Sequence, residues 1–196
     1  MSDPDSELML RVKSGEEGAF ARLVERFLRP LVAFFHRLGA DASFAEDCAQ
    51  EVFVKILRAR LAYEVRAKFS TYLFSVARHH WIDVVRHRAA GPGTFSGDAP
   101  DAGAEGAEGT LTERHPSLED APEARAERAE LAAALQRAVE TLSPEHREAF
   151  ALAQVEGLRY EEIGEILGVP VGTVKSRVHT AVHLLRERLV RAGFEP

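Results

Sequence analysis

A short run of polar side chains near the end of the sequence has the chemistry of a nucleic-acid contact. Its members are Thr173, Lys175, Ser176, Arg177, His179 and Thr180. Lysine and arginine can neutralise phosphates, while arginine, serine and threonine can also hydrogen-bond to base edges in the major groove of DNA. The pattern therefore indicates recognition of a nucleic acid rather than catalysis.

The helix that must position these residues is defined by its apolar side. Valine, alanine and leucine recur at about 100° per residue and form one stripe, which is expected to pack inward. The stripe consists of Val174, Val178, Ala181, Leu185 and Leu189. The polar residues are left on the exposed face, with Arg177 on its flank.

A second helix is predicted directly before this one, and a short break separates the two. Ile163, Ile166 and Leu167 give the earlier helix its own inward face. Gly168 suits the end of a helix, and Pro170 suits the first turn of the next, because its φ is fixed and it lacks an N–H. Two helices joined in this way predict a DNA-reading helix-turn-helix.

Positive charge is concentrated on the second of these helices. Residues 171–191 contain five basic residues and one acidic residue, a net charge of +4, whereas residues 126–170 contain four arginines and nine glutamates, a net charge of −5. A face that is merely solvated would more often mix the two signs at i,i+4 spacing. The separation favours DNA binding by residues 171–191, although the whole chain has a net charge of −6.

Length and composition exclude several classes of protein. A chain of 196 residues can hold one or two domains with enough core to fold without disulfides. Its single cysteine, Cys48, excludes an internal disulfide and any multi-cysteine zinc site. The acidic start, Met1-Ser-Asp-Pro-Asp, is followed by no long apolar run, so we expect neither a signal peptide nor membrane insertion, and a cytoplasmic location.

Residues 5–88 are predicted to be helical throughout, because no useful stretch alternates with period two. Pro30 is expected to kink a helix or to begin a new one. Ser43 and Glu46 have the spacing of a capping box and predict the start of a helix that runs from Phe44 to about Arg60. The predicted fold class is therefore all-α.

The helix from Phe44 has two distinct faces. Its core stripe is Ala49, Val52, Phe53 and Ile56, and its opposite side carries Asp47, Gln50, Glu51, Val54 and Arg58. Val54 is an apolar residue among charges. Such a residue can be an isolated exposed side chain without a role, or the apolar centre of a protein-docking face with a polar rim, and the residues alone leave both interpretations open.

A helix from Ser70 to about Arg88 combines aromatic and basic side chains. Residues 66–88 contain five basic residues and one acidic residue. Basic groups among aromatics suit a single-stranded nucleic acid, because phosphates are neutralised while unstacked bases find a π-face. The alternative is an ordinary amphipathic helix whose aromatics are core, as we expect of Phe74 and Trp81. The outward residues are Tyr72, Val76, His79, Asp83 and Arg86, with Arg66, Lys68 and Phe69 just before the helix.

Composition divides the chain into two helical domains. Residues 91–125 are rich in Gly, Ala, Pro and acid and have almost no large apolar residue, so they are predicted to be a flexible acidic linker. Residues 1–90 form the first predicted domain and residues 126–196 the second. The helix-turn-helix is the C-terminal part of the second domain. In the second domain, Leu131, Leu135, Ala138 and Leu142 are expected to face inward, and Ser143 is expected to cap a further helix.

Two other classes of function are compatible with some of these residues. A free-standing helix-turn-helix transcriptional regulator would share residues 160–189, but would more often have a ligand pocket or a dimer helix. A metal enzyme could use His79, His80 and Asp83, or His179 and His183, but neither set has a further ligand nearby and no H-E-x-x-H motif is present. We therefore expect no enzyme activity, no metal and no cofactor.

Four stretches in this order resemble the extracytoplasmic-function (ECF) sigma factors of bacterial RNA polymerase, a branch of the sigma-70 family. They are A-E-D-C-A-Q-E-V-F-V-K-I-L from Ala45, F-S-T-Y-L-F-S-V-A-R-H-H-W-I-D-V-V-R from Phe69, L-S-P-E-H-R-E-A-F from Leu142 and Y-E-E-I-G-E-I-L-G-V-P-V-G-T-V-K-S-R-V from Tyr160. The resemblance implies a transcription initiation factor whose partners are core RNA polymerase, promoter DNA and an anti-sigma factor.

The resemblance also implies roles for particular residues. Asp47, Gln50, Glu51 and Val54 would dock on core polymerase, which favours the docking interpretation of Val54. Lys68, Tyr72, His79, Asp83 and Arg86 would melt and read the minus-ten element. Thr173, Lys175, Ser176, Arg177, His179 and Thr180 would read the minus-thirty-five element. The family usually has Trp at Tyr72 and Asn at His79, and often a basic residue at Thr180, so the choice of promoter bases is expected to differ.

Overall fold

The computed structural model describes residues 3–90 and 122–194, and every regular element in these two ranges is helical. The helices are α1 (Pro4–Lys13), α2 (Ala19–Arg37), α3 (Ala42–Arg58), the 3₁₀ turn η1 (Arg60–Ala62), α4 (Phe69–Ala90), α5 (Pro122–Glu140), α6 (Pro144–Ala153), α7 (Tyr160–Leu167) and α8 (Val171–Arg191). The predicted all-α class is confirmed. The expected linker, residues 91–125, lies outside the described residues except for its last four, which belong to α5.

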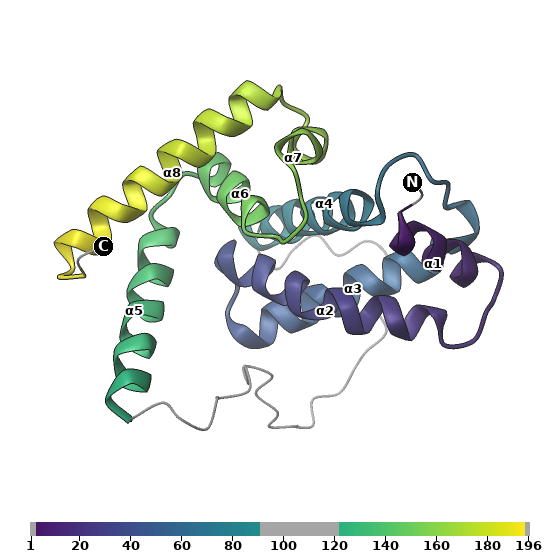
Figure 1. Cartoon of the computed structure of the whole chain (residues 1–196), viewed down its shortest axis with the longest axis horizontal. Helices are drawn as coiled ribbons and strands as arrows, with labels where there is room; N and C mark the ends of the chain where they lie inside the picture. Colours follow the sequence, from purple (N-terminus) through teal and green to yellow (C-terminus); the bar gives the residue numbers. More distant parts are fainter. Residues whose placement is uncertain (1–2, 91–121, 195–196) are drawn as a thin grey trace.

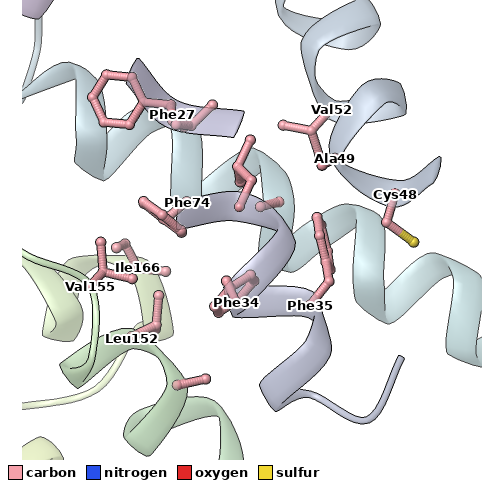
Figure 2. Packing of buried hydrophobic residues seen from close by; sticks show 14 of the residues in the cluster. Phe27, Phe34, Phe35, Cys48, Ala49, Val52, Phe74, Leu152, Val155 and Ile166 are labelled. Atoms are coloured by element: carbon pink, nitrogen blue, oxygen red, sulfur yellow. The ribbon is translucent and has the colours of Figure 1, made fainter. Parts of the chain in front are cut away.

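Helices α1 to α4 pack together as one layered group, and α6, α7 and α8 pack as another, with α5 beside α8 (Figure 1). The two groups also touch each other, because α7 contacts α4 and both α5 and α6 contact α2. One continuous cluster of buried apolar residues therefore runs through both groups. Figure 2 shows Phe34 and Phe74 of the first group facing Leu152, Val155 and Ile166 of the second.

Helix α2 continues through Pro30 instead of stopping there. Proline within a helix removes one hydrogen bond and costs about 3 kcal/mol. Leu23 and Phe27 before it and Leu31 and Phe34 after it are all buried on the same face. Burying a side chain of this size contributes about 1.5 to 3 kcal/mol, so the apolar stripe on both sides of Pro30 outweighs the local cost.

The start of α3 differs from the predicted capping box. The N-cap is Asp41, whose carboxylate accepts a hydrogen bond from the Phe44 backbone N–H at 2.9 Å, and the helix begins at Ala42. Ser43 therefore lies inside the first turn. Aspartate and serine are about equally good N-caps, and Asp41 is the one that follows the turn at Gly39, where φ is +104°.

The Asp3 carboxylate connects the start of the chain to α4. It accepts hydrogen bonds from the Ser6 backbone N–H at 3.1 Å, from the Ser6 hydroxyl at 2.7 Å and from the Phe69 backbone N–H at 2.8 Å. One side chain thus accepts hydrogen bonds from backbone N–H groups at the N-termini of both α1 and α4, where such groups have no partner within the helix. Burial opposes its negative charge, but these hydrogen bonds outweigh burial and lower the pKa of Asp3.

We expect Asp3→Ala to lower the free energy of unfolding at neutral pH by about 2 kcal/mol, because two helix caps are lost. Since the folded-state pKa of Asp3 is depressed, its contribution is present above the unfolded value of about 3.9 and is lost as the pH falls through the folded value. Urea unfolding across that acidic range measures both effects. Asp3→Asn is the matched control, because it keeps a capping oxygen but should remove this part of the pH dependence.

Candidate nucleic-acid and protein interfaces

The helix-turn-helix is formed by α7 and α8. Gly168 ends α7 in the left-handed region, with φ at +69°, and Pro170 is the N-cap of α8. The predicted inward stripe of α8 is confirmed at four positions, Val174, Val178, Ala181 and Leu185, which are buried. Leu189, the fifth, is only half-buried, because it lines an open groove between α5 and α8.

The N-terminal half of α8 exposes three of its six predicted DNA-binding side chains to solvent. Lys175, Ser176 and His179 are exposed, whereas Thr173, Arg177 and Thr180 are half-buried. The Ser176 hydroxyl donates to the Thr173 carbonyl at 3.0 Å, within the helix's own first turns. The exposed set combines an ammonium, a hydroxyl and an imidazole on one face, a combination that can contact phosphates and base edges together.

Gly164 allows the two helices of the motif to approach closely. A Cβ at this position would lie 2.9 Å from the Val169 carbonyl oxygen in the turn between α7 and α8. A Cβ atom is essentially never found this close to a backbone oxygen, so a larger residue at position 164 would push the turn away from α7. Sequence reasoning missed this constraint, although a glycine inside a helix, where it costs about 1 kcal/mol relative to alanine, was a signal for it.

On α3, the four residues predicted to dock on a partner are all exposed. Asp47, Gln50, Glu51 and Val54 follow one another at helical spacing, and the Val54 side chain is 38% exposed. Two more apolar residues continue the row: Leu57 on α3 and Leu61 on η1, which is 68% exposed. The sequence reasoning overlooked both, although the i, i+3, i+7 spacing of 54, 57 and 61 was a usable signal.

Cys48 lies on the flank of this row, one helical turn before Glu51. Its side chain is buried, and desolvation raises the pKa of the thiol to about 11, with the nearby Arg88 acting in the opposite direction. The thiol is therefore protonated near neutral pH and is a poor nucleophile. Cys48 is therefore a packing residue of α3.

The five residues of the predicted minus-ten surface do not lie together on one open face of α4. His79, Asp83 and Arg86 are exposed, as expected. Tyr72 and Lys68 are half-buried, and the Tyr72 ring packs against Tyr63 and Phe69 with centroid separations of 5.2 and 6.2 Å. Tyr72 and Val76 were expected to point outward, but both are partly buried against the apolar core.

His79 has a defined orientation on this surface. Its Nδ1 atom lies 2.7 Å from the Ser75 carbonyl oxygen. Because a carbonyl can only accept, Nδ1 carries the proton and Nε2 points away from this bond. Nε2 is therefore the ring nitrogen that His79 leaves available for a contact from outside the chain.

His80, which the metal alternative had grouped with His79 and Asp83, lies in a different environment. It is buried, its Nδ1 atom is 2.9 Å from Lys55 Nζ, and desolvation followed by the Lys55 charge lowers the pKa of His80. It therefore packs between α3 and α4 as a neutral ring. Within residues 3–90 and 122–194, no group of three or more His, Cys, Asp or Glu side chains could hold a metal ion.

Apolar side chains also line a groove of about 350 Å³ between α5 and α8. They include Leu131, Leu135, Val182, Leu189, Val190 and Phe194. Leu131 and Leu135 were expected to face inward, but they are 43% and 37% exposed, because Ala134 and Ala138 take the inner positions of α5. Exposed apolar clusters of this kind mark protein-binding surfaces.

Comparison with known proteins agrees with this arrangement. Residues 23–90 match the model for sigma-70 region 2, and residues 132–185 match that for sigma-70 region 4. The chain is 33% identical over 181 residues to the ECF RNA polymerase sigma factor SigW of Bacillus subtilis, covering 91% of this chain and 93% of the relative. It is 32% identical over 195 residues to the RNA polymerase sigma factor CarQ of Myxococcus xanthus, covering 95% and 98%.

Two solved structures share the fold. The structure of CnrH in complex with the cytosolic domain of CnrY has a TM-score of 0.66 at 24% identity and covers 97% of this chain and 99% of CnrH. The sigma factor RpoE in complex with the anti-sigma factor NepR, from Bartonella quintana, has a TM-score of 0.61 at 24% identity and covers 88% and 97%.

The fold and the two matched regions define a sigma-70-type transcription initiation factor. The chain belongs to the ECF sigma factors, the branch to which its relatives of similar length belong. Its function is to bind core RNA polymerase and direct promoter-specific transcription initiation, and the alternative of a free-standing regulator is not supported. Within the described residues, no helix has the length and apolar character needed to cross a membrane.

We expect Gly164→Ala to destabilise the helix-turn-helix by about 1 to 3 kcal/mol, because the new methyl group collides with the Val169 carbonyl. The unfolding midpoint in urea measures this change. Gly172→Ala in α8 is the control, since a Cβ there meets nothing within 4 Å. It should raise the stability by up to about 1 kcal/mol, the usual gain for glycine to alanine in a helix. Equal effects of the two substitutions would contradict the proposed close approach.

Proposed function

We propose that this sigma factor divides its work between three surfaces. The exposed row on α3, Asp47, Gln50, Glu51 and Val54, docks on core RNA polymerase. Helix α4 and the residue before it hold bases of the melted minus-ten element with Lys68, Tyr72, His79, Asp83 and Arg86. The N-terminal half of α8 reads the duplex minus-thirty-five element with Thr173, Lys175, Ser176, Arg177, His179 and Thr180. Catalysis belongs to the polymerase.

The two different sides of α8 give this proposal its strongest support. Helix α8 buries its apolar stripe completely at Val174 and Ala181, while Lys175, Ser176 and His179 on the other side remain exposed. A helix with one side fixed in a core and a cationic, hydrogen-bonding side in solvent can enter a major groove as a rigid unit. Phosphate neutralisation supplies affinity, and the hydroxyl and amine groups supply contacts to the bases.

The departures from the family pattern support a distinct promoter preference. An arginine that contacts guanine with two hydrogen bonds contributes about 1 to 3 kcal/mol of discrimination, and Thr180 cannot form such a pair. Tyr72 offers a smaller ring than tryptophan for stacking. We infer that the bases preferred at both promoter elements differ from those of relatives that have tryptophan and a basic residue at these positions.

An anti-sigma factor is proposed as a further partner, because one solved neighbour, RpoE, was determined with its anti-sigma factor. The apolar groove between α5 and α8 supports a protein ligand of this chain as well. The measurement is transcription by the reconstituted holoenzyme with and without each purified anti-sigma factor of the source bacterium. Full transcription in the presence of all of them would remove this partner from the proposal.

The proposed function is tested by adding the purified chain to sigma-free bacterial core polymerase and sequencing the promoters that are transcribed. We expect a defined set of promoters with conserved elements near minus ten and minus thirty-five. No association with core enzyme, or no transcripts from the mixture, would contradict it.

Replacing Lys175 and Arg177 with alanine should weaken binding to duplex promoter DNA and flatten its salt dependence. Each lost phosphate contact reduces the slope of log affinity against log salt by about 1. Fluorescence anisotropy at several salt concentrations measures both quantities. Arg188→Ala, at the far end of α8, removes the same charge outside the proposed contact and should leave the slope unchanged.

Replacing Asp47 and Glu51 with alanine should lower affinity for core polymerase by about 1 kcal/mol per residue, roughly fivefold, without changing which promoters are selected. The reason is that exposed charges at the edge of an interface control association rather than DNA sequence choice. Titration of labelled core enzyme measures the affinity. Glu17→Ala, an exposed acidic residue distant in sequence from α3, is the control, and an altered promoter set would argue against the assignment.

A further inference from the structure

Helix α1 holds the segment that leads into α4 at both of its ends. This segment runs from Tyr63, the residue after η1, to Phe69, the first residue of α4, and it passes beside α1 (Figure 1). The Lys13 ammonium, in the last turn of α1, donates to the Tyr63 carbonyl oxygen at 2.8 Å. The Asp3 carboxylate, at the N-cap of the same helix, accepts a hydrogen bond from the Phe69 backbone N–H at 2.8 Å.

Aromatic packing anchors the same two ends. Tyr63 is only 4% exposed, and its ring centroid lies 5.2 Å from that of Tyr72 and 6.4 Å from that of Phe69. The Phe69 ring is completely buried and packs against Phe27 of α2, with the centroids 5.3 Å apart. The backbone groups that Lys13 and Asp3 hold therefore belong to residues whose side chains are fixed in the core.

Between these anchors the segment faces solvent. Glu64, Val65 and Arg66 are exposed, and the Arg66 side chain is 84% exposed. The ion pair between Arg66 and Glu64, at 2.8 Å, lies within the segment and does not tie it to another helix. Surface segments with few buried contacts are the most mobile parts of a fold. The position of this one consequently depends on its anchors at Tyr63 and Phe69.

Two residues of the proposed minus-ten surface take their positions from the Phe69 end. Lys68 directly precedes α4, and its carbonyl accepts from the Tyr72 backbone N–H at 3.2 Å, which closes the first turn. The first N–H groups of a helix have no partner within it, and a side-chain acceptor there stabilises the turn. Lysine has only donors, so the Lys68 side chain cannot supply this acceptor. Asp3 supplies it from α1.

We propose that Asp3 and Lys13 are positioning residues for recognition of the minus-ten element. Neither side chain contacts DNA. Both act through the backbone of the segment, and they determine where Lys68 and Tyr72 meet the melted strand. A recognition site works only when its side chains are held within a fraction of an ångström of the productive geometry by the residues behind them. The inference rests on the proposed role of α4 and adds to it a helix that is not part of the minus-ten surface.

The test measures how well the holoenzyme discriminates between minus-ten sequences. The probes are two labelled single strands, one with the minus-ten sequence of the promoters that the holoenzyme selects and one with a single base of it replaced. We expect Lys13→Met and Asp3→Ala each to lower the ratio of the two Kd values by about fivefold, the lower end of what one stacked base contributes. A merely structural loss would reduce the active fraction for both probes equally and leave the ratio unchanged.

Conservative substitutions should restore the ratio. Asp3→Asn keeps an oxygen that can accept from the Phe69 N–H. Lys13→Arg keeps a donor for the Tyr63 carbonyl. Arg11→Met is the matched control, because Arg11 is an exposed cation of the same helix and its loss changes the net charge as Lys13→Met does. Its ratio should equal that of the wild type.

Hydrogen exchange in the free full-length chain tests the anchoring without nucleic acid. Lys13→Met and Asp3→Ala should speed backbone exchange in peptides that cover residues 63–72, whereas Arg11→Met should not. Because Asp3→Ala also removes the cap of α1, Lys13→Met decides the outcome if Asp3→Ala does not fold.

Unchanged exchange in Lys13→Met would overturn the anchoring. An unchanged Kd ratio in Lys13→Met, or an equal fall in Arg11→Met, would overturn the positioning role. A wild-type holoenzyme that does not distinguish the two probes would instead count against the proposed function of α4.

Discussion

The structure depends on one apolar contact, in which the aromatic side of α2 and α4 meets the aliphatic side of α6 and α7. Phe34 and Phe74 are completely buried there, together with Leu152 and Ile163. Burial of side chains of this size contributes about 1.5 to 3 kcal/mol each. The contact therefore determines how the two helical groups sit against each other, and with it which functional surfaces are open and which are covered.

Electrostatics act in the same direction as this packing. Residues 66–88 have a net charge of +4, and residues 126–170 have a net charge of −5. The two segments meet through Lys68 and Glu162 and through Arg78 and Glu148. The acidic segment is thus complementary to α4 as well as distinct from the basic α8.

Local sequence rules predicted a helix end correctly where the residue that caps it is close to it in sequence. Ser143 caps α6 and Gly168 ends α7, as predicted. The rules were less reliable where several polar residues compete or where the partner is distant. Asp41 rather than Ser43 caps α3, and the Asp3 carboxylate contributes to the start of α4 from more than sixty positions away, at a distance of 2.8 Å. No pattern within a short window reports a contact of that kind.

The sequence by itself determined the all-α fold, the helix-turn-helix, the exposed row on α3 and the exposed polar side of α8, because each depends on periodicity and caps within a single helix or helix pair. Only the tertiary structure decided that Lys68 is paired with Glu162, that Tyr72 is half-buried, that Leu131 and Leu135 are exposed, and that Gly164 must be glycine at its close approach to Val169. Those outcomes depend on which helix packs against which face. Hydrophobic burial specifies that a face must be covered but not which element covers it, so the choice is made only when the whole chain has folded.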